Sequence, residues 1–279
     1  MGFLLVEVAL PWPRDISEIP EVGALSGMLD GRRLRVQAVV PTGGPRLVVA
    51  HVRSGFDDGR FAGYARRQAA VVDGDLGAAV ADALGGVTSE AGAPGGRGRD
   101  LLVCTHGRRD VCCGSLGTEL ALGTQALDLP EGVRCLRTSH TGGHRFAPTF
   151  IVLPEGTAWA FADLDLVLRV MWRRGSAADV VDRYRGCSGL GGPRVQALER
   201  EVFRIVGWDL LDRPRVAREL GEEVVELAVD NPNGTVDVWR GAVVPGRVLA
   251  VPDCMRPLGD AKKSDTEWVV RDVALVASE

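Results

Sequence analysis

Between Phe146 and Phe161 the chain reads FAPTFIVLPEGTAWAF, and this stretch predicts more of the fold than any other. Its apolar residues at 148–153 and 157–162 are typical of two short buried strands, and the Pro-Glu-Gly sequence between them is typical of a turn. A helical pattern follows at residues 164–174. The stretch therefore predicts a pair of strands joined by a tight turn and followed by a helix.

This arrangement resembles the part of thioredoxin-like proteins in which a cis-proline opens a buried strand. In that fold the proline faces a functional loop after the first strand, and here this loop would begin at Cys104, after the apolar residues 101–103. The resemblance implies a cis bond between Ala147 and Pro148 and an α/β (α+β) fold with a thioredoxin-like core. A dithiol oxidoreductase needs C-x-x-C at that point, whereas Cys104 is followed by Thr-His-Gly.

The residues before position 100 predict a first α/β half with elements in the order β, α, β, β, α. Apolar and periodic runs place these strands and helices at residues 3–10, 15–29, 33–41, 46–53, 61–69 and 75–84, the last two being helical. The Thr-Gly-Gly-Pro sequence at 42–45 predicts a hairpin between the two strands beside it.

Glycine-rich residues 85–100 are the best linker candidate, and a similar order of elements begins after them. We therefore expect an N-terminal α/β half at residues 1–98, which the repeated order suggests is a degenerate thioredoxin-like repeat. A second thioredoxin-like domain is expected at residues 99–211. At 212–279, β-like runs alternate with Asn-Gly and Pro-Gly turns and predict a small antiparallel β extension.

Composition narrows the class of protein. The 279 residues carry a net charge of −4 with scattered Lys and Arg, so we expect no nucleic-acid partner. No apolar run approaches the ~18 residues that would span a bilayer, and the first ten residues lack the basic start of a signal peptide. We expect a cytoplasmic protein without a membrane partner, in which clustered cysteines indicate metal binding or catalysis more often than disulfides.

Two glycine-rich loops hold three of the six cysteines and three of the four histidines. The first is CTHGRRDVCCG at residues 104–114, and the second is SHTGGHRFAP at residues 139–148. Thiolates and imidazoles gathered on loops after apolar strands are typical of a metal site. Eight residues between Cys104 and Cys113 are too many for a zinc finger, although a Cys2His2 zinc site of another kind stays open.

Two other motif classes fit less well. Rieske centres begin with C-x-H, which Cys104 and His106 match, but their second C-x-x-H is absent because Cys135 lies five positions before His140. A phosphatase loop needs an arginine six positions after its cysteine, and position 110 is Asp. Buried reduced cysteines also occur as small apolar residues, but packing alone leaves the neighbouring histidines unexplained.

The two loops, together with Tyr-Arg-Gly at 184–186, resemble the sucrase/ferredoxin-like family, a branch of the thioredoxin-like ferredoxins. The resemblance extends over about residues 1–210 and implies no sugar chemistry. It implies a [2Fe-2S] cluster on cysteines spaced C-x8-C and histidines spaced H-x3-H. These spacings map to Cys104, Cys113, His140 and His144, with Cys112 as the alternative ligand because it adjoins Cys113.

Residues next to these ligands are expected to support the cluster without binding it. They are His106, Arg109, Asp110, Gly142, Gly143, Arg145 and Pro148. We expect Asp110 to accept backbone N–H bonds and to pair with an arginine. The remaining three cysteines are expected to pack in the interior, and these are Cys135, Cys187 and Cys254.

The sequence thus predicts an electron-transfer or redox-sensing protein with a [2Fe-2S] cluster and a partner protein that exchanges electrons with it. Imidazole ligands are neutral, so the potential is expected above that of an all-cysteine cluster. One alternative is a structural zinc protein with a Cys2His2 site. The other is an enzyme that uses the cleft between the two halves, for which we find no general base and nucleophile pair.

Overall fold

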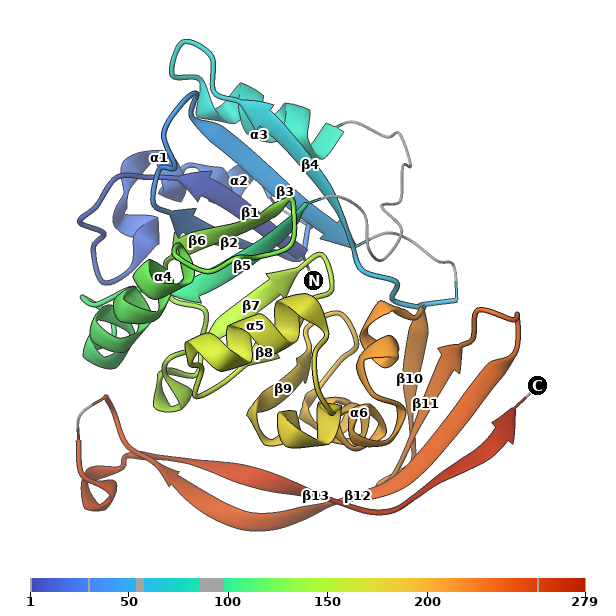
Figure 1. Ribbon diagram of the computed structural model, residues 1–279. Helices are drawn as coiled ribbons and strands as arrows, with labels where there is room; N and C mark the ends of the chain where they lie inside the picture. The colour runs from blue at the N-terminus through green and yellow to red at the C-terminus, as the bar shows by residue number, and fades with distance from the viewer. Residues whose placement is uncertain (1, 30, 54–57, 86–97, 255, 279) are drawn as a thin grey trace.

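The computed structural model describes residues 2–29, 31–53, 58–85, 98–254 and 256–278. Its larger sheet has nine strands in the order β4-β3-β1-β2-β6-β5-β7-β8-β9, and its smaller sheet has four strands in the order β10-β11-β12-β13. Helices cover the faces of the larger sheet, and the smaller sheet lies beside the edge of the larger sheet that β9 forms (Figure 1). The predicted α/β fold class is confirmed.

The first half contributes four strands to the larger sheet. Its elements are β1 (Gly2–Glu7), α1 (Pro20–Gly23), α2 (Leu25–Met28), β2 (Leu34–Val39), β3 (Leu47–Arg53), β4 (Tyr64–Ala70) and α3 (Leu76–Gly85). β1 runs parallel to β2 and antiparallel to β3, and β3 runs antiparallel to β4. β1 therefore lies inside the sheet, as expected for a strand whose six residues are all buried.

The second half repeats this order. Its elements are β5 (Arg99–Cys104), the π-helical turn η2 (Cys113–Gly117), α4 (Thr118–Thr124), β6 (Val133–Thr138), η3 (His144–Phe146), β7 (Phe150–Leu153), β8 (Thr157–Trp159) and α5 (Leu164–Trp172). β5 is parallel to β6 and antiparallel to β7, and β7 is antiparallel to β8. The two halves thus share one topology, and the predicted cis bond between Ala147 and Pro148 is present.

The halves join where β2 meets β6, the equivalent strand of each half, in an antiparallel pair. The backbone N–H of Val40 donates to Arg137 at 2.9 Å, and that of Ser139 donates to Ala38 at 2.8 Å. One apolar layer crosses this junction, because Phe3 and Leu5 of the first half belong to the same buried cluster as side chains of β5, β6 and β7. The result is a single continuous sheet.

Two local predictions for the first half are wrong. Residues 64–69 of the predicted helix at 61–69 belong to β4 instead, because pairing along the whole of β3 outweighs the weak helical pattern. The predicted hairpin at 42–45 also fails, since β2 and β3 pair with opposite edges of β1 and not with each other. Residues 86–97 of the predicted linker lie outside the described residues.

Local signals set the helix ends beside the second half. α5 begins after Asp163, whose side chain accepts a 2.8 Å bond from the backbone N–H of Leu166. The next long helix, α6 (Pro193–Val206), has proline at its first turn and ends at Gly207, whose φ is 87°. The apolar face of α6 packs into the main core of the second half. Between α5 and α6 lies the edge strand β9 (Tyr184–Cys187).

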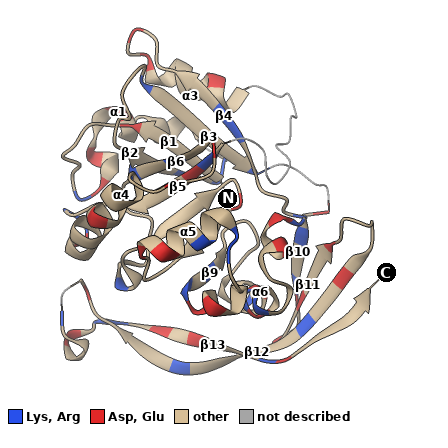
Figure 2. Ribbon diagram, viewed as in Figure 1, with Lys and Arg blue, Asp and Glu red and all other residues tan. Residues whose placement is uncertain are grey.

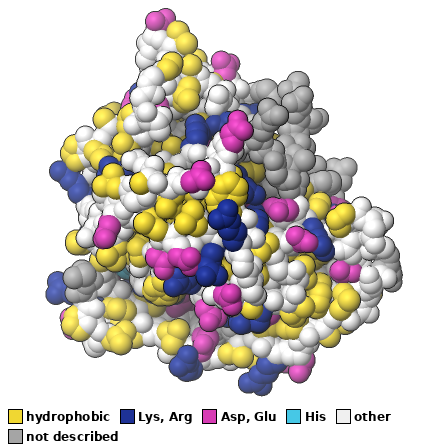
Figure 3. Space-filling model, viewed as in Figure 1, with side chains coloured by type: hydrophobic (Ala, Val, Ile, Leu, Met, Phe, Trp, Pro, Cys, Tyr) yellow, Lys and Arg dark blue, Asp and Glu magenta, His cyan; other side chains and the backbone are white. Residues whose placement is uncertain are grey.

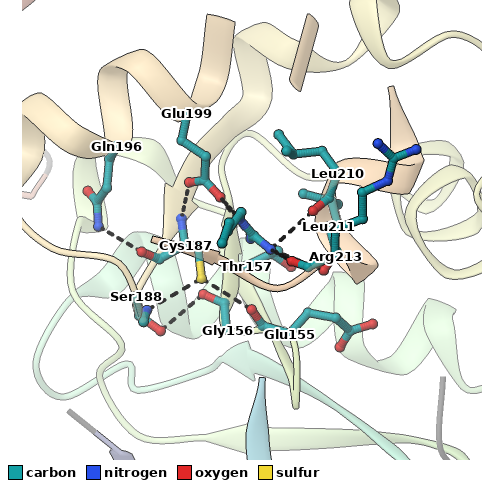
Figure 4. Close-up of polar contacts among 12 residues, drawn as sticks. Glu155, Gly156, Thr157, Cys187, Ser188, Gln196, Glu199, Leu210, Leu211 and Arg213 are labelled. Carbon is teal, nitrogen blue, oxygen red and sulfur yellow. Dashed lines mark hydrogen bonds and ion pairs between the residues drawn. The ribbon is translucent and has the colours of Figure 1, made fainter. Parts of the chain in front are cut away.

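A buried polar network fastens β9 to α6 (Figure 4). Glu199 of α6 accepts hydrogen bonds from the backbone N–H of Cys187 at 2.8 Å and from the hydroxyl of Tyr184 at 3.0 Å. The guanidinium of Arg215 lies 2.8 Å from the same carboxylate, and both charged side chains are almost fully buried. Truncating one partner of such a pair leaves an uncompensated charge and is strongly destabilising.

The C-terminal sheet is antiparallel throughout, which matches the predicted β extension. Its strands are β10 (Arg215–Leu220), β11 (Val224–Asp230), β12 (Val236–Val251) and β13 (Lys263–Ser278). β12 and β13 form a long hairpin that passes under the second half, and its turn lies far from the chain terminus (Figure 1). The outer parts of both strands are largely exposed.

Charged side chains of both signs are interspersed over the molecule. Figure 2 shows basic and acidic residues alternating along the strands and helices, and the face in Figure 3 mixes them with apolar side chains. Opposite charges pair across strands, as where Arg240 contacts Glu226 and Arg247 contacts Glu267. In the described part of the chain, no helix combines the length and apolarity that a bilayer crossing needs.

Candidate metal centre

Sheet topology brings the two glycine-rich loops together. β5 and β6 are parallel neighbours, so the loops that leave their carboxyl ends emerge at the same edge of the sheet. Cys104 is the last residue of β5, and His140 lies two residues beyond β6. β7 is antiparallel to β5 and starts at this edge, which places Pro148 beside Cys104; the N–H of Cys104 donates to the carbonyl of Thr149 at 3.2 Å.

Hydrogen bonds converge on the sulfur of Cys104, which is buried. The side chain of Cys113 is the strongest partner, and the side chain of His140 and the backbone N–H groups of Thr141 and His106 add to it. Together they outweigh the cost of burial and lower the pKa of Cys104 to about 4. The bond to Cys104, followed by burial, raises the pKa of Cys113. The two cysteine side chains therefore interact directly.

Asp110 lies between the two histidines. Its Oδ1 accepts a hydrogen bond from Nδ1 of His144 at 3.3 Å. Its Oδ2 lies 2.8 Å from Nδ1 of His140, which is within ion-pair distance, but the two atoms are not aligned for a hydrogen bond. With both Nδ1 atoms facing the carboxylate, Nε2 is the ring nitrogen left for another ligand.

The predicted pairing of Asp110 with an arginine is therefore wrong. The carboxylate is only 9% exposed and faces the second loop, where the histidines supply the nearest positive or hydrogen-bonding groups. The predicted bonds from backbone N–H groups to this carboxylate are also not found among the described residues. Instead the backbone of Asp110 takes part in the first loop, because its own N–H donates to the carbonyl of His106 at 3.0 Å. The residue thus links the two loops.

Glycines allow the first loop to fold tightly between Cys104 and Cys113. A Cβ on Gly114 would lie 2.4 Å from the Cα of Gly107, so the two ends of the loop are in backbone contact. A Cβ on Gly117 would lie 1.9 Å from the carbonyl oxygen of Cys104. Since real Cβ atoms do not approach this closely, side chains at these positions would push the two cysteines apart.

The second loop depends on glycine for a different reason. Gly142 and Gly143 have φ values of 92° and 72°, in the left-handed region that favours glycine. A Cβ on Gly143 would lie 2.6 Å from a guanidinium nitrogen of Arg185. The two glycines therefore turn the chain between His140 and His144 and leave room for the guanidinium of Arg185 against the second loop.

Two partly buried arginines flank the second loop. Arg35 of β2 donates to the carbonyls of Thr141 at 2.8 Å and His140 at 2.6 Å, and Arg185 of β9 lies over the ring of Phe146. Burial lowers the pKa of both arginines. Among the described residues, neither has a carboxylate at ion-pair distance, so both guanidinium charges remain available to an anionic group nearby.

The other predicted neighbours have separate partners. His106 lies with Nε2 2.8 Å from the carbonyl of Pro13, while its Nδ1 accepts a 3.3 Å bond from the backbone N–H of His140. Arg109 makes a long contact of 3.4 Å to the carbonyl of Arg14. Both ring nitrogens of His106 are thus engaged, which agrees with a supporting role and not with ligation.

Sequence reasoning missed two residues. Arg35 lies in the first half, more than 100 positions before the loop that it contacts, and only the pairing of β2 with β6 brings them together. Cys254 was predicted to pack in the interior, but it is only partly buried and its sulfur lies 2.9 Å from that of Cys112. The prediction for Cys254 is wrong because the long hairpin carries this residue to the first loop.

The candidate ligands form two pairs. Cys104 contacts Cys113, and His140 and His144 share Asp110; His140 also contacts Cys104. Among the residues that the structure describes, no three His, Cys, Asp or Glu side chains gather closely enough to hold one metal ion. The described side chains thus bring together the sulfur pair and the imidazole pair, but not one compact group of four.

A comparison with known families identifies this region. The model of the family described as sucrase/ferredoxin-like matches residues 34–186, which include both loops and Tyr184-Arg185-Gly186. No curated protein and no solved structure matched the chain. The family match covers more than half of the chain and both candidate ligand pairs. The chain therefore belongs to the sucrase/ferredoxin-like family.

Proposed function

We propose that this protein carries a [2Fe-2S] cluster and uses it to transfer electrons or to sense redox state. Cys104 and Cys113 would hold one iron, and His140 and His144 the other. We further propose that it works in the cytoplasm, where cysteines stay reduced, and exchanges electrons with a partner protein.

The contact between the two cysteine sulfurs carries this proposal. Cys104 and Cys113 come from opposite ends of a loop closed by backbone contact between glycines, and their side chains are both 1% exposed. Two buried sulfurs in contact are a favourable donor set for an iron, because a metal binds thiolates and its binding releases their protons.

Because the imidazole pair is separate from the sulfur pair, the arrangement favours a site with two metal ions over a site with one. In a [2Fe-2S] centre with mixed ligands, two sulfurs hold one iron and two imidazoles hold the other. This division matches the sulfur pair and the Asp110-linked pair, whereas a mononuclear zinc site needs four ligands around one point. Metal-binding histidines usually give their other ring N–H to a carboxylate, which is the role that Asp110 would have.

The surrounding groups suit a cofactor that gains negative charge on reduction. When bound, the cluster supplies one-electron chemistry. Backbone N–H groups of His106 and Thr141 point at the sulfur of Cys104, and hydrogen bonds to cluster sulfur raise reduction potentials. The guanidinium of Arg35, held by two carbonyls of the second loop, would favour the reduced state by its charge.

The geometry favours a redox protein over an enzyme at the junction of the halves. In the described part of the chain, two pockets are lined by residues of both halves. The one beside His106 and His140 has a volume of about 170 Å³, and the other, between Arg33, Arg53 and residues 188–191, has a volume of about 710 Å³. Pockets for ordinary organic ligands measure about 300–1,000 Å³. The two serines that line these pockets are not bonded to a general base, because Ser139 bonds to Gln37 and Ser188 bonds to Tyr64 and Gly156. We therefore assign the pockets no reaction.

Anaerobic purification tests the proposal directly. The protein should be brown, contain iron and acid-labile sulfide in equal amounts, and give an EPR signal after one-electron reduction. Colourless protein with stoichiometric zinc would establish the structural zinc alternative and refute the ferredoxin.

Variants then test the ligands. Cys113→Ser and His144→Ala should lose the visible absorption, while Cys112→Ser should keep it. Cys135→Ser is the matched control, because this cysteine lies against α4 away from both loops. If Cys112→Ser bleaches the protein and Cys113→Ser does not, the assignment of the second sulfur ligand is wrong.

A further inference from the structure

Two cysteines outside the proposed ligand set are in contact although 142 positions separate them. The sulfur of Cys254 lies 2.9 Å from that of Cys112, and the backbone N–H of Cys112 donates to the sulfur of Cys254 at 3.2 Å. Both residues are partly exposed and neither is in a disulfide. The two sulfurs are close enough that bond formation requires only a small movement of the side chains.

The two cysteines belong to different parts of the fold. Cys112 is the residue before η2 in the first glycine-rich loop, next to the proposed ligand Cys113. Cys254 lies in the turn of the long hairpin, between β12 and β13. In Figure 1 this turn reaches the side of the molecule at which the loops after β5 and β6 emerge. Contact between the two sulfurs therefore joins the hairpin to the candidate metal centre.

The outer part of the hairpin has few other attachments to the core. Asp265 at the start of β13 lies 2.6 Å from Arg145 in the second loop. Behind this ion pair is a pocket of about 320 Å³, lined by the hairpin on one side and by β9 and α6 on the other. Val248 and Leu249 of the outer β12 are 71% and 41% exposed. The hairpin turn is thus held at the loops and not by a packed interface.

We propose that Cys112 and Cys254 are a redox-active pair that forms a reversible disulfide between the hairpin turn and the first loop. The oxidant is a low-molecular-weight disulfide. One protein thiol loses its proton and attacks that disulfide, which gives a mixed disulfide and releases one small thiol. The second protein thiol then displaces the other small thiol. Two protein thiols are oxidised to one disulfide, and the reagent is reduced to two thiols.

The bond would fix the hairpin turn across the mouth of the metal centre. The sulfur of Cys112 also lies 3.4 Å from the carbonyl of His144, so the cross-link would restrain the second loop as well as the first. The oxidised protein would keep both loops closed, while the reduced protein would let the hairpin turn move away. This inference concerns residues outside the proposed ligand set and holds whichever metal the site binds.

Peptide mapping of the full-length protein tests the pair. The protein is incubated with oxidised glutathione, its remaining thiols are alkylated, and it is digested with trypsin. The sequence predicts one cross-linked species that joins residues 110–134 to residues 248–262 and that disappears on reduction with dithiothreitol.

Single substitutions identify the sulfurs. The cross-linked species should be absent from Cys112→Ser and Cys254→Ser and should form normally in the matched control Cys135→Ser. Three results would overturn the proposal: glutathione bound separately to each cysteine without a cross-link, no reaction at either, or a cross-link that persists in Cys112→Ser, which would make Cys113 the partner.

Discussion

Replacing Asp110 with alanine removes the carboxylate that faces Nδ1 of both His140 and His144, at 2.8 and 3.3 Å. The imidazoles then lose the group that fixes which nitrogen carries the proton and how each ring is turned. Asp110 is 9% exposed, so its removal also leaves space for water beside both rings. We expect the protein to fold and to hold the proposed cluster less tightly.

The size of this effect follows from the position of the carboxylate. Substitution of a residue that orients a metal-binding histidine costs about 10–100-fold in metal affinity, or about 1.4–2.7 kcal/mol. Asp110 contacts both histidines, so the upper part of this range is expected. Asp110→Asn should fall between wild type and Asp110→Ala, because an amide can still accept a bond from one of the two rings.

The assay is the rate at which a ferrous chelator bleaches the visible absorption of anaerobic protein. Asp163→Ala is a suitable control, since it removes the cap of α5, costs about 1 kcal/mol of stability and lies outside both loops. The chelation rate should rise for Asp110→Ala and stay near wild type for Asp163→Ala. Equal rates in both variants would show that Asp110 does not orient the histidines. Pulsed EPR nitrogen couplings should change only in the Asp110 variants.

Three further predictions concern packing, potential and pH. Gly114→Ala places a methyl group 2.4 Å from backbone of the same loop and should lower the free energy of unfolding by about 1–3 kcal/mol. Gly27→Ala is the control, since it meets no atom within 4 Å and lies in α2, so it should leave the melting temperature unchanged or raise it slightly. Arg35→Gln removes a partly buried charge worth on the order of 1 kcal/mol and should lower the reduction potential by about 40 mV in redox titrations; an unchanged potential would contradict the role of this charge. Burial alone would raise the pKa of Asp100, but its bond to His51 and neighbouring arginines lower it to about 2, below the unfolded value of 3.8. This stabilisation, about 2 kcal/mol, is present above about pH 4 and lost as pH falls towards 2, so urea midpoints of Asp100→Asn should depend less on pH across that range than those of wild type.

Strong local patterns predicted the second half well. The apolar runs beside Pro148 gave both strands and the helix that follows, because hydrophobic spacing and a Pro-Glu-Gly turn act over a few residues. The helix predicted at 61–69 failed because β4 is stabilised by its pairing with β3, which the sequence of β4 does not encode. Similarly, the apolar pattern of β1 shows that it is buried but not which strands lie on either side.

The candidate site was also predicted in part, with local motifs recognised and long-range contacts missed. Motif spacing singled out the four proposed ligands, and strand order then explains why their loops meet. The contacts of Asp110, Arg35 and Cys254 depend on side chains that reach between loops, between halves and from the hairpin. Such contacts follow from tertiary structure, and a single sequence contains no periodic signal for them.

The pairing of β2 with β6 also bears on whether the second half can be produced as a separate, soluble fragment. A fragment that began at residue 99 would keep every proposed ligand, but β6 would become an open edge strand with unpaired backbone groups, and such edges promote aggregation. The fragment would also lack Arg35 and Pro13, which hold the second loop and His106. The first half therefore protects the edge of the half that carries the proposed ligands, and a protein made for biophysical work should contain both halves.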